Sequence, residues 1–255
     1  EPVPIPTTRS GADRTQPVGR GQPNSLGLHD MAGNVWEYVW DRPGDVCDAR
    51  QNDRHTVFGG AFDGASPGGR KRDFAQTPWR GNYNIGFRIV RREPGLAKPE
   101  PSAADSPVPE WTIHRGEVIH PPEGETPRAE LSMAAIPEGG YIRRDEARVA
   151  LSPFHMSETE IPFHVFRQVQ QWAAVNGYEL DGDVDMGSMD WRTGDYPHGP
   201  DEPATDITWH TAMVWCNALS EMQGRTPCYY ADEAKMEVVR KPNLWRIAMY
   251  RGTVG

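Results

Sequence analysis

Hydrophobic residues are arranged differently in the two halves of this 255-residue sequence. In the first half they form short clusters, separated by Gly, Asn, Asp and Pro, without helical periodicity. This pattern predicts short strands and long loops. The last cluster predicts a closing strand over residues 86–90, with Phe87 and Ile89 on one face. The clusters lie at residues 26–28, 35–40, 57–62 and 85–90.

The second half contains two stretches with helical periodicity. Pro162 can occupy the first turn of a helix whose apolar residues recur at three- and four-residue steps, until Asn176-Gly177 ends it. A second helix is expected over residues 209–222, with Thr208 as its N-cap and Gly224 just beyond its end. The second half therefore provides the regular helical part of the fold.

Strands are expected on both sides of the predicted helices. Residues 133–137 and 148–156 alternate as strands do, and a Gly139-Gly140 turn joins them. After the second helix, residues 229–249 alternate poorly, which indicates mixed strand and loop.

A stretch of low hydrophobicity separates the two halves. Residues 93–109 are mainly Pro, Ala, Ser and acidic residues, which is typical of a semi-extended linker. The polar residues 120–130 extend this linker or form a surface loop. The chain is therefore divided into residues 1–94, a linker over 95–130, and residues 131–255.

Composition restricts the fold and the partners. The 26 Gly and 24 Pro favour an irregular, loop-rich fold over a helical bundle. The formal net charge is −9, and its acidic excess argues against a nucleic-acid partner. No apolar run approaches the roughly 18 residues of a membrane span. The sequence begins with Glu1 and shows no basic and apolar leader, so we expect that a leader was removed or not included.

The most informative string is NSLGLHDMAGNVWE in the first half. It contains two carboxylates, Asp30 and Glu37, the amide of Asn34, and Gly33, which lets the backbone turn its carbonyl groups inward. Calcium binds side-chain and backbone oxygens together, so this stretch could surround one ion. In the alternative interpretation it is a buried turn, in which Asp30 and Asn34 cap backbone amides and Trp36 fills the core.

The order of several motifs resembles a known family. The string GLHDMAGNVWEYVWD, followed by Gly59-Gly60-Ala61-Phe62 and Ile85-Gly86-Phe87-Arg88, resembles the C-terminal part of the formylglycine-generating-enzyme family, also called the sulfatase-modifying-factor domain. The second half is similar to the N-terminal part of the same domain, in stretches that begin at Ala135, Phe154 and Ile207. The resemblance covers nearly everything except the linker.

The order of the two parts is inverted relative to one complete domain. The chain is therefore either cut from a tandem array, which we favour, or a circular permutant. In both cases neither half completes a domain alone, although the halves could dock and share one core.

The resemblance implies a loop-rich, irregular α+β fold similar to C-type lectins and often bound to calcium. It also implies a calcium site formed by the side chains of Asp30 and Glu37 and the carbonyl groups of Gly33 and Val35. This implied site agrees with the number of oxygens that the residue chemistry suggests.

Family members that generate formylglycine hold copper with two cysteines. Counted from the Gly-Gly pair at residues 59–60, these positions are occupied here by Gly64 and Gly69, so we expect no copper site of that kind. Cys47 lies too early to replace them, and Cys216 lies on the apolar stripe of the second helix as a small hydrophobe. Cys228 could pair with Cys216 only in an oxidising compartment.

Two functional hypotheses follow. In the first, the protein lacks redox chemistry and binds an unknown ligand or protein partner through a loop that carries aromatic and polar groups. The alternative is an enzyme of the same family, an oxygen-dependent oxidase of cysteine or another thiol, whose active segments lie outside this chain. The resemblance slightly favours a secreted or periplasmic location. The candidate ligand-binding residues are Arg70, Trp79, Arg80, Asn82 and Tyr83.

Overall fold

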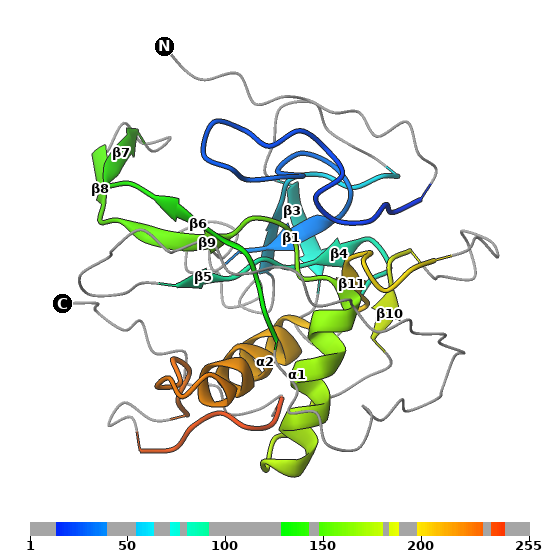
Figure 1. Ribbon diagram of the computed structural model, residues 1–255, viewed down its shortest axis with the longest axis vertical. Helices are drawn as coiled ribbons and strands as arrows, with labels where there is room; N and C mark the ends of the chain where they lie inside the picture. The colour runs from blue at the N-terminus through cyan, green and yellow to red at the C-terminus, as the bar shows by residue number, and fades with distance from the viewer. Residues whose placement is uncertain are drawn as a thin grey trace.

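The protein combines short strands with two helices, as the sequence predicts. The structure, a computed structural model, describes residues 14–39, 55–63, 72–76, 81–91, 129–142, 148–180, 184–188, 198–231 and 236–242. In Figure 1 the strands lie mainly above and the two helices lie together below, so the fold is a loop-rich α+β fold. The elements are β1 (Trp36–Tyr38), β2 (His55–Phe58), β3 (Arg72–Gln76), β4 (Ile85–Gly86), β5 (Val90–Arg91), β6 (Met133–Ile136), β7 (Gly139–Ile142), β8 (Arg148–Leu151), β9 (Phe154–Ser157), α1 (Phe163–Val175), β10 (Asp185–Met186), β11 (Ala204–Thr205) and α2 (Trp209–Met222).

Strand pairing joins the two halves of the chain. One sheet has the order β3-β2-β1-β4 and comes entirely from the first half. A second sheet has the order β5-β9-β6, so a first-half strand pairs with second-half strands. In it, Val90 of β5 lies opposite Met156 of β9 in antiparallel register. Backbone hydrogen bonds therefore cross the boundary between the halves.

Both helices form where their apolar spacing predicts them. In α1 the buried side chains follow the predicted stripe, and Pro162 occupies the N-cap position. The hydroxyl of Thr208 caps α2 by accepting a hydrogen bond from the Thr211 N–H at 3.0 Å. Gly177 and Gly224, just beyond the two helices, have positive φ angles, which stop each helix at low cost.

Three predictions about the strands were wrong. Gly139 and Gly140 do not form a turn, because they belong to β7 and pair with β8. The strand expected over 148–156 is divided into β8 and β9, and Pro153, which has no N–H to donate, lies in the break. The strand expected over 86–90 is also divided, because β4 pairs with β1 in one sheet and β5 pairs with β9 in another.

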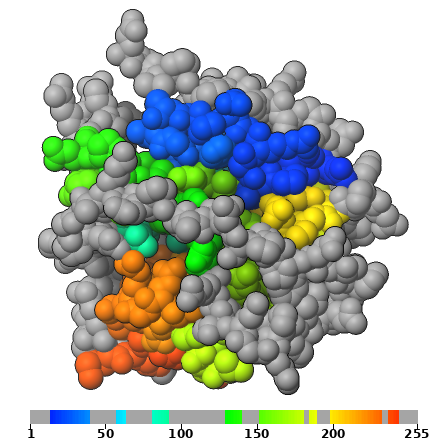
Figure 2. Space-filling view, viewed as in Figure 1, coloured from blue at the N-terminus to red at the C-terminus, as the bar shows by residue number. Residues whose placement is uncertain are grey.

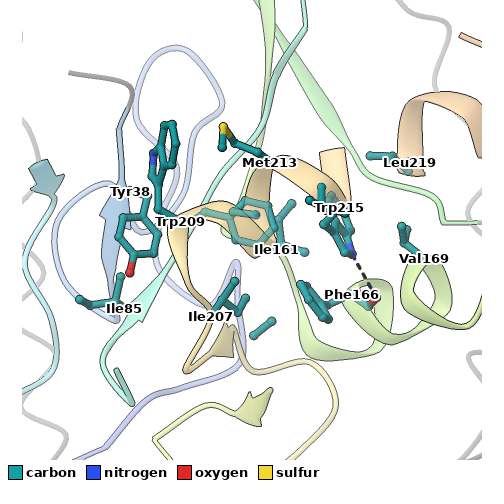
Figure 3. Packing of buried hydrophobic residues seen from close by; sticks show 14 of the residues in the cluster. Tyr38, Ile85, Ile161, Phe166, Val169, Ile207, Trp209, Met213, Trp215 and Leu219 are labelled. Atoms are coloured by element: carbon teal, nitrogen blue, oxygen red, sulfur yellow. Dashed lines mark hydrogen bonds between the residues drawn. The ribbon is translucent and has the colours of Figure 1, made fainter. Parts of the chain in front are cut away.

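One hydrophobic core contains residues from both halves. Phe87 contacts the edges of Phe166 and Trp215, with ring centroids 6.4 and 5.3 Å apart. The rings of Phe166 and Trp215 stack, and the Trp215 indole N–H donates to the Phe166 carbonyl at 3.1 Å (Figure 3). The expectation that the halves dock and share one core is therefore confirmed.

Close backbone contact reinforces this docking. A Cβ atom on Gly81 would lie only 2.1 Å from the Asp206 carbonyl oxygen. The loop before β4, residues 81–84, therefore requires glycine at this position. In Figure 2, first-half residues in blue lie directly against second-half residues in green and yellow. Most of the predicted linker, residues 95–128, lies outside the described residues, while Ala129 is buried against the core. Among the described residues, no helix is long and apolar enough to span a membrane.

Candidate functional site

The turn before β1 is held by backbone hydrogen bonds to its neighbours. Asp30, Gly33 and Asn34 all have positive φ angles, which gives this turn its tight course. The Gly33 N–H donates to the Gly59 carbonyl at 3.1 Å, and the Trp36 N–H donates to the Asn84 carbonyl at 2.8 Å. The turn is thereby fixed against the loops next to β2 and β4.

The polar side chains of this turn cap backbone groups. Asp30 Oδ2 accepts a hydrogen bond from the Gly19 N–H at 2.7 Å, and Asn34 Oδ1 accepts one from the Gln16 N–H at 2.9 Å. Trp36 is buried in the core. These contacts are the ones that the buried-turn interpretation predicts.

Glu37 forms an ion pair with Arg88. Arg88 Nη2 lies 2.8 Å from Glu37 Oε1, and Nε lies 3.1 Å from Oε2, which gives a bidentate contact. The Glu37 side chain is 12% exposed and the Arg88 side chain is 3% exposed, so water screens the charges of this pair little. This partner was not predicted for Glu37, although Arg88 belongs to a motif quoted for the resemblance.

The guanidinium of Arg88 also connects the two halves. Its Nη1 donates to the carbonyls of Ser157 and Glu158 at 2.9 and 2.8 Å, and its Nη2 donates to the His29 carbonyl at 2.8 Å. With the Glu37 contacts, all five N–H donors are used. Burial lowers the pKa of Arg88, but the nearby carboxylates, Glu37 foremost, outweigh burial and raise the pKa overall.

Glu160 is the least expected member of this cluster. It is fully buried, and within the described part of the chain neither of its carboxyl oxygens has a hydrogen-bond partner. Burial raises its pKa well above the ordinary value, and Glu37 and Asp30 add to the rise, while Arg88 opposes it. The sequence did not single out Glu160, because nothing in the residues around it distinguishes a buried acid from an exposed one. We call Asp30, Glu37, Arg88 and Glu160 the Arg88 cluster.

The predicted calcium ligands fit an ion in part. Asp30 uses Oδ2 for the Gly19 N–H, which leaves Oδ1 for another partner. The carbonyl oxygens of Met31 and Val35 lie near Gly59, 3.5 and 3.8 Å from where a Cβ atom on that glycine would lie. Among the described residues, no three His, Cys, Asp or Glu side chains are grouped to hold a metal. A calcium ion here would therefore depend on backbone oxygens, with Glu37 shared with Arg88.

The described part of the candidate ligand-binding loop lies close to Asp63. The Tyr83 hydroxyl donates to Asp63 Oδ2 at 2.9 Å, and Asn84 Nδ2 donates to the same oxygen at 3.0 Å. The Asn82 carbonyl accepts hydrogen bonds from the N–H groups of Ile85 and Asp206, both at 3.0 Å. Arg70, Trp79 and Arg80 lie outside the described residues.

A second polar cluster, also missed from the sequence, joins the N-terminal segment to the second half. Glu202 Oε2 accepts hydrogen bonds from Thr15 Oγ1 at 2.5 Å and from His198 Nδ1 at 2.8 Å. The Thr15 N–H donates to Ser188 Oγ at 3.2 Å. Thr15 is 173 positions from Ser188 and 187 positions from Glu202, so no local motif could indicate this cluster.

The described cysteines are poor candidates for redox ligands. Burial raises the pKa of the Cys216 thiol, and the nearby Cys228 thiol raises it further. Cys228 is exposed as a residue, but desolvation of its thiol still raises its pKa. A raised pKa disfavours the thiolate, which is the form that binds copper or attacks a substrate. Cys47, Gly64 and Gly69 lie outside the described residues.

Arg88→Met tests the stabilising role of the cluster. The substitution removes every donor to Glu37 and leaves its carboxylate buried, so we expect the free energy of unfolding to fall by roughly 3–5 kcal/mol. Lys241→Met is the control, because Lys241 and its partner Glu179 are both exposed, and we expect a loss of about 0–1 kcal/mol. Urea denaturation followed by tryptophan fluorescence measures both. Equal small losses would contradict the assigned role of Arg88.

Glu160→Gln tests the buried carboxyl group. Because folding raises the pKa of Glu160, its stabilising contribution is complete below the ordinary value of 4.5 and is lost as the pH rises toward the folded value. Gln imitates the protonated form, so we expect the variant to lose less unfolding free energy than the wild type as the pH rises above 4.5. Glu158→Gln, which removes a carboxyl group at a half-buried position, is the control. Identical profiles for Glu160→Gln and the wild type would contradict the assignment.

Comparison with known families agrees with the motif order. A family model described as the sulfatase-modifying factor enzyme 1-like domain matches residues 4–93 and 119–251. No curated protein and no solved structure matches the chain. The match spans most of both halves, and the chain therefore belongs to the sulfatase-modifying factor enzyme 1-like domain family.

Proposed function

We propose that this chain is a member of its family without formylglycine-generating chemistry, and that it binds a ligand or protein partner through its loops. The observation that carries the proposal is the residue type at the two metal-binding positions. Counted from the Gly-Gly pair at residues 59–60, Gly64 and Gly69 fall where the resemblance implies the family's cysteines, and glycine has no side chain to hold copper.

The remaining thiols support this proposal. Cys216 is half-buried on α2, beside the hydrophobic core, and the raised pKa of both described thiols keeps them protonated at neutral pH. Thiolate sulfur is the soft ligand that copper requires. The described cysteines therefore provide no evident replacement for the missing pair.

The loop before β4 has the features of a binding surface. Tyr83 packs edge-on against Phe62, with ring centroids 6.1 Å apart, and its hydroxyl is directed at the exposed Asp63. The backbone of this loop is fixed to Asp206 through Asn82. A hydroxyl and an aromatic ring on a fixed loop, next to the Asp63 carboxylate that follows β2, are suited to recognising a polar ligand.

Incubation with a cysteine-containing sulfatase peptide tests the absence of the chemistry. We expect no formylglycine in the peptide by mass spectrometry, with or without added copper, because the two thiolate positions are glycine. A two-cysteine member of the family, assayed in parallel, is the positive control. A formylglycine product would support the alternative of an enzyme and overturn the proposal.

Calcium binding at Asp30, Gly33, Val35 and Glu37 is the second part of the proposal. The remaining oxygen of Asp30 and the Val35 carbonyl oxygen near Gly59 support it. The Glu37 carboxylate has room for about four accepted contacts, so the Arg88 contacts leave capacity for a metal. Bound calcium would stabilise the turn and would supply no redox chemistry.

A calcium titration tests this site. We expect calcium to raise the melting temperature of the wild type relative to chelator, because calcium binds the folded turn. The calcium-dependent rise, rather than the absolute melting temperature, should disappear in Glu37→Gln. It should persist in Asp63→Asn, a control at an exposed acid outside the turn. The same melting temperature in calcium and in chelator would refute calcium binding.

A further inference from the structure

The chain reverses direction after α2 and returns beside the helix. Gly224 has a φ of +70°, and its N–H donates to the Glu221 carbonyl at 2.9 Å. The Arg225 N–H donates to the Ser220 carbonyl at 2.7 Å. These bonds close the helix end and direct the following residues back along the last turns of α2.

Asn217 holds the returning segment against α2. Its Oδ1 accepts hydrogen bonds from the N–H groups of Cys228 and Tyr229, both at 3.0 Å. Its Nδ2 donates to the carbonyls of Tyr229 and Val239 at 2.8 and 3.0 Å. Asn217 is fully buried, and these four hydrogen bonds fix the Cys228 backbone beside it. Asn217 directly follows Cys216 in α2.

Cys216 directly precedes Asn217 in α2, and the backbone N–H of Cys228 is bonded to the Asn217 side chain. Cys216 and Tyr229 both pack against the hydrophobic core, from the helix and from the returning segment. Burial is the main reason that the pKa values of Cys216 and Tyr229 are raised. Cys228 adds to the rise for Cys216, and both thiols add to the rise for Tyr229.

We propose that Cys216 and Cys228 are a disulfide-forming pair that links α2 to the returning segment when a small-molecule disulfide, such as oxidised glutathione, is present. Both thiols are reduced in this structure. The proposal is independent of the proposed function, because it concerns a covalent modification away from the Arg88 cluster and the loop before β4.

The reaction has two exchange steps. Cys228, the more exposed cysteine, loses its proton, and its sulfur attacks oxidised glutathione to form a mixed disulfide and release one glutathione thiolate. The Cys216 thiolate then attacks Cys228 Sγ, which forms the intrachain disulfide and releases the second glutathione. Both cysteines are oxidised, oxidised glutathione is reduced to two thiols, and the two cysteine protons pass to solvent and to the released thiolates.

The environment of the thiols sets the rate of this reaction. Because burial raises the pKa of both thiols, only a small fraction is thiolate at neutral pH. The rate of disulfide formation should therefore rise by on the order of tenfold per pH unit between about pH 7 and about pH 8. Once formed, the bond closes a short loop and should raise the melting temperature by roughly 5–10 °C.

Peptide mapping of the full chain tests the proposal. The protein is incubated with oxidised glutathione, remaining thiols are alkylated, and digestion is done without reductant. We expect one cross-linked peptide pair that contains Cys216 and Cys228, with Cys47 alkylated. A disulfide that involves Cys47, a stable glutathione adduct on Cys228, or full alkylation of both cysteines would overturn the proposal.

A variant separates the bond from oxidation in general. Cys228→Ser changes an exposed residue and keeps the backbone N–H that bonds to Asn217, so we expect it to fold. Oxidised glutathione should then leave its melting temperature unchanged, whereas it raises that of the wild type. An equal rise in both proteins would overturn the assigned pair.

Discussion

The fold depends on how one buried guanidinium satisfies its donors. Arg88 directs all five N–H groups at a carboxylate and three backbone carbonyls, and two of these carbonyls belong to the other half of the chain. Removing a cation from water costs several kcal/mol, and the cost is offset only when every donor has a well-placed acceptor. This requirement fixes the turn before β1, the segment between β4 and β5, and the end of β9 at mutually defined positions.

The other contacts between the halves depend less on charge and more on shape. The β5–β9 pairing supplies backbone hydrogen bonds, and the Phe87–Phe166–Trp215 group supplies apolar contact. The second polar cluster fastens the N-terminal segment through Thr15. Together they allow two partial sequences to form one core within a single chain. A circular permutant requires such a core, and a fragment of a tandem array is also compatible with it, so both origins stay open.

The sequence predicted the features that depend on neighbouring residues. Both helices form as expected because apolar spacing, a capping Thr208 and the terminal glycines act within a few residues. The buried-turn contacts of Asp30 and Asn34 were also predictable, because short polar side chains cap nearby amides. Gly139 and Gly140 were misassigned because their conformation is set by the partner strand β8, which local composition does not encode.

The partners of charged groups could not be predicted for the same reason. Glu37 and Arg88 are 51 positions apart, and the carbonyls that Arg88 binds in the second half are about 70 positions away. The motif strings identified both residues as notable without indicating that they meet. Sequence could therefore locate the turn and its acids, whereas the identity of the cation that faces them required the fold.

Charge balance relates the ion pair, the buried acid and the proposed calcium. Three carboxyl groups, those of Asp30, Glu37 and Glu160, influence one guanidinium, so the cluster has an excess of negative charge when all of them ionise. Without another cation, the raised pKa of Glu160 relieves this excess by retaining a proton. A calcium ion at the turn would relieve the same excess and would favour ionised Glu160. If calcium binds as proposed, proton retention by Glu160 and calcium binding would be alternative ways to neutralise one site, and calcium binding would weaken as Glu160 becomes protonated.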